Sequence, residues 1–246
     1  TWKYLGLTYN IAYMIAGGAT LLLSVFAFFY FPYFRADTPQ VTKMVLKKRY
    51  GLYYALQFMA GARRQIFMVF VGFMMVERFG FEVHQLTALY LINLVINIFM
   101  APVIGGLVAR FGERRALLFE YLGLILVFSA YGGIYWFGWG VVLASILYVV
   151  DHIFFALALA LKTYFQKIAD PEDIAPTAAV AFTINHISAV FLPVLLGYLW
   201  LTSPALVFVA ATFMALGSFS LALLIPRHPE KGNETIFGGI GQPRNA

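Results

Sequence analysis

Cysteine is absent from this 246-residue sequence, which excludes a disulfide framework and any cysteine-ligated metal site. No Gly-Lys-Ser or Gly-Lys-Thr phosphate-binding loop occurs either, which argues against an ATP-driven motor in this chain. Charged residues are scarce, at 11% of the sequence, where soluble domains carry roughly 25%. The histidines and acids show no recognised catalytic or metal-ligand spacing. We therefore expect no enzyme activity, no bound metal and no cofactor.

Apolar residues dominate the sequence. They make up 62% of it, aromatic residues alone make up 18%, and the mean hydropathy is +0.82. A chain of this size cannot bury so much apolar surface in one water-soluble globule, so its solvent must be lipid. The net charge of +6 does not indicate a nucleic-acid partner, because the positive charges fall in short loops rather than on one face. No signal peptide opens the sequence, and we expect a further segment upstream of Thr1.

Seven apolar runs are each long enough, at about 20 residues, to cross a bilayer as a helix. The sequence therefore predicts an all-α fold, a polytopic bundle of about seven transmembrane helices. The breaks between the runs contain proline, glycine and charged residues, which are ordinary helix-ending signals. The polar, glycine-rich tail after residue 225 is expected to be poorly ordered. The predicted spans cover residues 8–31, 50–76, 85–108, 116–136, 141–165, 174–200 and 205–225.

Lysine and arginine are distributed unequally between the two sides of these spans. One face receives Lys3 and Arg78, while the other receives thirteen basic residues, with Arg63 and Arg64 left aside. Since short cytoplasmic loops are enriched in basic residues, the second face and the carboxyl tail are predicted to be cytoplasmic. Residues 40–49 are either an amphipathic helix on this membrane surface or a solvated connection.

The loop between the third and fourth predicted spans reads Gly105-Gly106-Leu107-Val108-Ala109-Arg110-Phe111-Gly112-Glu113-Arg114-Arg115. It resembles the cytoplasmic loop signature of the major facilitator superfamily, Gly-x-Leu-x-Asp-Arg-x-Gly-x-Arg-Arg. The matching residues are Gly105, Leu107, Arg110, Gly112, Arg114 and Arg115, whereas Ala109 replaces the acidic residue. We expect one glycine to allow close packing, the second to turn the chain, and Glu120 to pair with Arg114 or Arg115.

The resemblance implies a secondary active transporter with twelve spans in two halves, working by alternating access. Residues 1–33 would then be its sixth helix, 34–49 the cytoplasmic connection between the halves, 50–225 the carboxyl-terminal half and 226–246 a cytoplasmic tail. The implied partners are membrane lipid, a small-molecule solute and the missing amino-terminal half, in a bacterial cytoplasmic (inner) membrane.

Polar residues occur deep inside four predicted spans. If Arg63 and Arg64 lay at a membrane boundary, only about 18 Å of helix would remain to cross a core of about 30 Å. The arginine pair is therefore predicted near mid-depth, where an arginine costs at least about 2.5 kcal/mol unless something compensates its charge. In the superfamily, the four helices concerned border the central cavity. The other polar residues at similar depth are Asn93, Asn97, Asp151, His152, Asn185 and His186.

These residues predict a water-accessible cavity that binds a small polar or anionic solute. Arg63 or Arg64 would attract the solute, and Asp151 would be its counter-ion or a protonation site in a proton-driven cycle. His152 and His186 would contribute to binding or to proton coupling. A structural ion pair between Asp151 and an arginine is the alternative role for these charges. The alternative functions are a transport-inactive scaffold or assembly subunit of a larger membrane complex, and a membrane-embedded enzyme using the histidines and Asp151.

Overall fold

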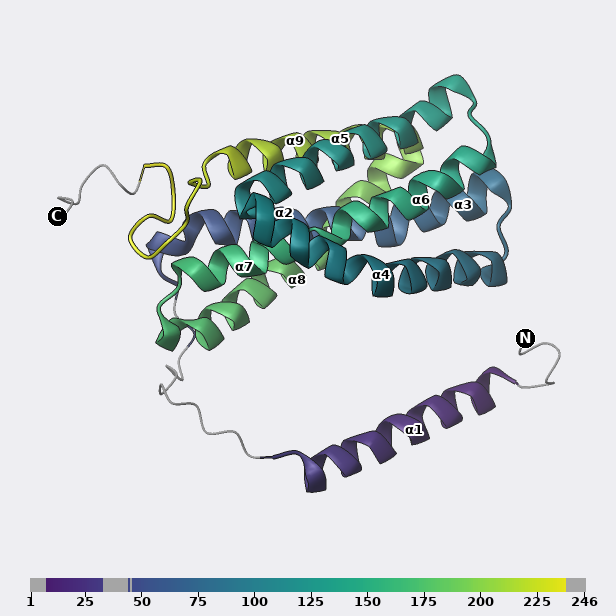
Figure 1. The fold of residues 1–246 in the computed structure, drawn as a ribbon. Helices are drawn as coiled ribbons and strands as arrows, with labels where there is room; N and C mark the ends of the chain where they lie inside the picture. The colour runs from purple at the N-terminus through teal and green to yellow at the C-terminus, as the bar shows by residue number, and fades with distance from the viewer. Residues whose placement is uncertain (1–7, 33–43, 45, 238–246) are drawn as a thin grey trace, which may run out of the picture. The chain divides into compact units, whose positions relative to one another are not determined.

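A computed structural model describes residues 8–32, 44 and 46–237 of the chain. The all-α prediction is confirmed, because these residues form helices and no strand (Figure 1). Seven helical segments are long and apolar enough to cross a membrane, and each end lies within three residues of its predicted position. The protein is therefore an integral membrane protein. The chain divides into two compact units, residues 1–39 and 40–246.

The first unit contains one helix, α1 (Tyr9–Tyr30). In the interior of this apolar helix the hydroxyls of Thr20 and Ser24 donate hydrogen bonds to carbonyls one turn earlier. Side chains satisfied in this way are compatible with a lipid-facing helix, because no water is needed to complete their hydrogen bonds. The helix ends where the N–H of Phe31 donates to Ala27, directly before Pro32. Proline lacks the donor that a further helical turn would need.

The second unit is a bundle of six spans. Two of them, the second and the fifth, contain more than one helical segment, and a short 3₁₀ turn precedes the helix of the sixth. The second span contains α2 (Gly51–Gln65), a π-helical stretch (Ile66–Val71) and α3 (Gly72–Phe79). The remaining helices are α4 (Val83–Phe111), α5 (Glu113–Phe137), α6 (Val141–Ala156), α7 (Leu159–Ile168), α8 (Ile174–Thr202) and α9 (Pro204–Leu223).

Within the bundle, α5 and α9 lie side by side along most of their length, and α2 packs against α8 and α9 (Figure 1). Large buried side chains such as Tyr121, Phe128 and Phe208 fill the space between these helices. The outer faces of α4 and α8 are different, because they carry exposed apolar side chains such as Ile98 and Leu201. Exposed apolar faces of this extent are stable against lipid and not against water.

Two spans depart from the uninterrupted helices that the sequence predicts. The π-helical stretch starts two residues after Arg64, and the fifth span breaks between α6 and α7. At this break the N–H groups of Leu157 and Ala158 donate to carbonyls three residues earlier, at 3.0 and 3.1 Å. Such tighter turns leave some carbonyls without their usual helical partners. Both irregularities fall in the middle of the membrane-spanning segments.

The loops on one side of the bundle are joined by ion pairs into what we term the basic end, comprising Lys47, Arg49, Asp170, Asp173 and Glu234. Lys47 lies 2.6 Å from Asp173, and Arg49 bridges Asp170 at 2.9 Å and Glu234 at 3.1 Å. The hydrogen bond to Asp173 raises the pKa of Lys47, so this lysine stays charged across the physiological range.

The first part of the carboxyl tail belongs to this basic end. The side chain of Glu234 pairs with Arg49, and its backbone carbonyl accepts a 2.6 Å hydrogen bond from the buried hydroxyl of Tyr164. The prediction of a poorly ordered tail is therefore wrong for residues 226–237, because polar backbone groups find partners on the helix ends. Of residues 40–49, for which an amphipathic helix and a solvated connection are both open, residues 40–43 and 45 lie outside the described residues, as does the tail after residue 237.

Candidate solute site

A cavity of about 780 Å³ lies between α2, α4, α6, α7 and α8, which form the four spans predicted to border one. The structure brings five of the eight predicted site residues to its wall: Arg64, Asn97, His152, Asn185 and His186. The other three, Arg63, Asn93 and Asp151, are buried in the bundle away from the wall. The predicted polar residues therefore form two groups, one accessible and one enclosed.

Arg64 is held at the cavity wall by an uncharged partner. Its guanidinium donates a 2.9 Å hydrogen bond to the side-chain oxygen of Asn185 on α8. The amide nitrogen of Asn185 donates in turn to the carbonyl of Gln57, one helix away, at 3.2 Å. No carboxylate among the described residues forms an ion pair with Arg64. Its position is fixed while its charge stays uncompensated.

Gly61 sets the close approach of α2 and α8, and sequence reasoning missed it. A Cβ at this position would lie 2.5 Å from the carbonyl oxygen of Asn185 and also too close to the hydroxyl of Ser188. Small residues allow such close backbone contact between membrane helices. Gly61 therefore brings Asn185 near enough to bond Arg64 and Gln57.

Gly61→Ala is expected to destabilise the protein by about 1–3 kcal/mol, because the added methyl group meets backbone that cannot yield. Gly72→Ala is the matched control, since a Cβ there meets nothing within 4 Å. Thermal unfolding of purified protein in detergent measures both. An equal melting temperature for Gly61→Ala and the parent would contradict the close contact.

The two histidines of the cavity differ in their surroundings. The Nδ1 of His186 lies 2.8 Å from the carbonyl oxygen of Phe182, which can only accept a hydrogen bond. Nδ1 therefore carries a hydrogen, and Nε2 is the ring atom left for a bound solute. His152 lies beside the Phe67 ring, with 6.2 Å between centroids. Among the described residues no group of three or more His, Asp or Glu side chains is close enough to hold a metal ion.

The enclosed group contains a buried ion pair that the sequence did not predict. Arg63 on α2 lies 3.2 Å from Glu120 on α5, and the two residues are only 2% and 0% exposed. The arginine also covers the Tyr121 ring at 4.5 Å and donates to the carbonyl of Met59. The structural ion pair considered as an alternative thus exists, with Glu120 rather than Asp151 as its acid.

The expectation that Glu120 pairs with Arg114 or Arg115 is wrong. On a helix, Arg115 points about 140° away from Glu120, since each residue turns the chain by about 100°. Glu113, Leu117, Glu120 and Leu124 share the buried face of α5, whereas Arg115 is exposed. Glu120 therefore points into the bundle, and the only cation it meets among the described residues is Arg63.

Asp151 lies near this ion pair without joining it. It is 2% exposed, and its Oδ1 has no hydrogen-bond partner among the described residues. Arg63 and Glu120 are close enough to act on its charge. One arginine thus faces two carboxyl groups in the membrane interior. An excess negative charge is costly there, so a proton on one carboxyl is the simplest compensation.

Asn93 and Tyr131 complete the enclosed group. Both polar atoms of the Asn93 side chain and the hydroxyl of Tyr131 are buried without a partner among the described residues. Buried polar groups in folded proteins are rarely left unsatisfied. Tyr131 is close enough to Asp151 for the two groups to interact electrostatically.

The loop between α4 and α5 turns at a glycine, as the superfamily signature implies. Gly112 has φ +81° and ψ 160°, a conformation that side chains strongly disfavour. The close packing expected at Gly105 is absent from the described residues, because a Cβ there would meet nothing within 4 Å. Arg110 and Arg115 are exposed, and Arg114 is half-buried; none of the three forms an ion pair with a described residue.

The acid that anchors this loop is Glu113, which the signature leaves unspecified. It is buried, and it forms a 2.7 Å ion pair with Lys167 of α7. Sequence reasoning missed Glu113 because a single acid among arginines looks like a solvated loop residue. The pair joins the α4–α5 loop to the end of α7.

Gly112→Ala is expected to lower the free energy of unfolding by about 1–3 kcal/mol, the usual cost of this backbone conformation for a residue with a side chain. Gly106→Ala is the control: it lies inside α4, and a Cβ there meets nothing. Alanine stabilises a helix interior relative to glycine. Opposite signs for the two variants in detergent unfolding are predicted, and a neutral Gly112→Ala would contradict the turn geometry.

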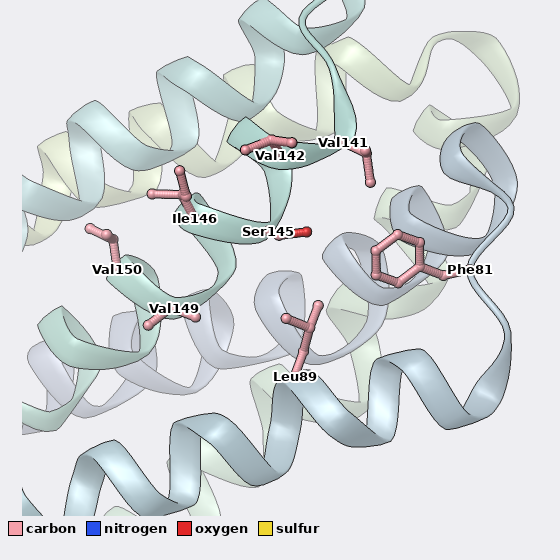
Figure 2. Close-up of a pocket in the computed structure, with 8 residues that line it drawn as sticks. All are labelled: Phe81, Leu89, Val141, Val142, Ser145, Ile146, Val149 and Val150. Carbon is pink, nitrogen blue, oxygen red and sulfur yellow. The ribbon is translucent and has the colours of Figure 1, made fainter.

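A second cavity, of about 640 Å³, lies between α4 and α6 (Figure 2). Among its lining residues the only polar side chain is Ser145, and Leu89 lies on α4, across from the helix α6 that carries the valines and Ile146 (Figure 2). A cavity with this lining offers no group that could recognise a polar or charged solute. We therefore take the first cavity as the candidate solute site. The lining residues of the second are Phe81, Leu89, Val141, Val142, Ser145, Ile146, Val149 and Val150.

Comparison of the chain with models of protein families, with curated proteins and with solved structures gives no match in any of the three.

Proposed function

We propose that the protein is a secondary active membrane transporter of the major facilitator type that carries a small polar or anionic solute. The observation that carries this proposal is the cavity between α2, α4, α6, α7 and α8. It places Arg64, Asn97, His152, Asn185 and His186 on one wall, halfway along helices that are otherwise apolar. Polar groups inside a membrane are costly, and this cost is understandable if they bind a solute in transit.

The shape of the surrounding helices supports alternating access. Arg64 precedes the π-helical stretch by two residues, and the α6–α7 break contributes Ala158 and Leu159 to the cavity wall. Interrupted helices at mid-membrane are common where transporters bind solute and change conformation. Pro102 and Pro193, inside α4 and α8, add two further points where these helices can bend.

The membrane orientation is part of the proposal. The basic end would face the cytoplasm, together with the carboxyl tail, in a bacterial inner membrane. The Glu113–Lys167 pair and the Arg49 pairs would then hold this side in one conformation of the cycle. An amino-terminal half would supply the opposite wall of the cavity, and a proton held by Asp151 is the proposed driving ion.

Cysteine accessibility tests the transport proposal without knowledge of the solute. The 246 residues contain no cysteine, so Ala101→Cys or Ala178→Cys on the cavity wall is the only thiol in this part of the protein. A membrane-impermeant maleimide is applied to right-side-out and to inverted vesicles. A transporter predicts labelling from both sides. Ala211→Cys, which is fully buried, is the matched control and should stay unlabelled.

Labelling of both cavity positions from one side only would overturn alternating access. It would favour instead the transport-inactive scaffold, for which a fixed cavity is sufficient. Stoichiometric co-purification with a larger membrane complex would point the same way.

A further inference from the structure

The cavity wall carries positive charge that no acid offsets. Its cationic side chains are Arg64 on α2 and Lys162 on α7, and none of its lining residues is aspartate or glutamate. Within the described residues, Arg64 has only the neutral Asn185 as a side-chain partner, and Lys162 forms no ion pair. Arg63 differs from both, because its charge is balanced by an ion pair with Glu120.

The same wall is largely aromatic and aliphatic. Tyr53 and Phe165 stack at 4.3 Å between centroids, and Phe182 lies 3.9 Å from the ring of His186. Phe155 supplies a further ring to the lining. Uncharged hydrogen-bonding groups such as Gln57 and Gln166 lie among these rings. Tyr53 and Phe165 are buried against each other, whereas Phe155 and Phe182 leave apolar surface open to the cavity. An organic body would cover this surface, and a hydrated inorganic ion would not.

We infer that this site takes an organic anion with an aromatic or compact apolar body, its negative group between Arg64 and Lys162 and its body against the rings of Phe155 and Phe182. The inference rests on the proposed function and narrows its solute class. Arg64 is held by a neutral amide and so keeps its full charge for a ligand, and the unpaired Lys162 adds a second positive charge. The volume of about 780 Å³ fits a small molecule rather than a bare ion.

Charge is the first property to test. Purified full-length protein in detergent is titrated with benzoate, its neutral analogue benzamide and its cationic analogue benzylamine, and binding is measured by calorimetry. We expect saturable binding of benzoate, at least about tenfold tighter than that of either analogue. Equal binding of benzamide or benzylamine would overturn the inference. Equal binding of inorganic phosphate would overturn the aromatic part of it.

Variants of the two cations locate the site. Lys162→Gln is expected to weaken benzoate binding at least tenfold, since Lys162 has no ion-pair partner among the described residues whose loss could disturb the fold. Arg64→Gln should weaken it further, and Arg64→Lys should recover part of the loss. The matched control is Arg115→Gln, which removes an equal charge from an exposed position on α5. Unchanged binding in Lys162→Gln would overturn the site.

The outcomes for this inference and for the transport proposal are separable. Two-sided labelling of the cavity cysteines without a preference for benzoate would leave the transporter and refute the anion class. Benzoate binding with one-sided labelling would establish the anion site and refute alternating access.

Discussion

Arg63→Ala is expected to lower the free energy of unfolding by about 3–5 kcal/mol, because it leaves Glu120 buried without its cation. Glu120→Ala should cost less, because the Asp151 carboxyl remains close enough to Arg63 to balance its charge. The pair is enclosed, with both side chains at most 1% exposed, and it joins α2 to α5 across the bundle. Lipid offers the freed charge no compensation, so the loss also reduces the amount of folded protein in the membrane. Unfolding in detergent and the yield of inserted protein measure the effect.

A double variant separates the ion pair from simple packing. Arg63→Met combined with Glu120→Leu replaces both charges by apolar groups, and this should recover most of the stability lost in either single variant. Arg115→Ala is the control on the same helix: it is exposed and unpaired among the described residues, so its effect should stay within about 0.5 kcal/mol. Single variants as stable as this control would contradict a buried pair.

The membrane spans could be predicted from the sequence because they depend on a property that single residues carry. A run of about 20 apolar residues is sufficient for a span whatever it packs against. The positions of Arg63 and Arg64 near the middle of their span could also be predicted, because they follow from the helix length that a span requires. The cavity-lining role of Asn97, His152, Asn185 and His186 could be anticipated because unpaired polar groups avoid lipid and gather inside the bundle.

The partners of these residues could not be predicted, since pairing depends on how helices rotate against one another. Glu120 illustrates this: near the arginine-rich loop in sequence, it belongs in space to Arg63, 57 residues away. The α6–α7 break is equally hidden, because residues 156–160 alternate alanine and leucine, which are strong helix formers. Gly61 looks like any other glycine until α8 is placed against it.

The two neighbouring arginines belong to different groups, Arg64 to the accessible one and Arg63 to the enclosed one. Arg64 lines the cavity, whereas Arg63 is enclosed and paired with Glu120. Asp151 remains beside Arg63 with an unpartnered oxygen. Under the proposed function, Asp151 would gain and lose a proton when the surrounding helices move and would not touch the solute.

Asp151→Asn is expected to abolish the pH dependence of cavity accessibility. The groups that act on Asp151 are Arg63 from α2, Glu120 and Tyr131 from α5, and Tyr148 from its own helix. Removing its proton adds a negative charge beside an arginine that Glu120 already balances, so the protonated and ionised states favour different helix arrangements. The labelling rate of Ala178→Cys should then change with pH, on the order of 5–150-fold for a typical coupling.

The sign of the effect follows from the chemistry of the substitution. Asparagine has the shape of protonated aspartate and cannot ionise, so Asp151→Asn should show at every pH the labelling rates that the parent shows at low pH. His152→Gln, one residue along on α6, is the control for a titratable neighbour at the cavity and should keep the pH dependence. If Asp151→Asn kept it while His152→Gln lost it, the proton would belong to the cavity wall. The enclosed carboxyl pair would then be a structural element of the bundle.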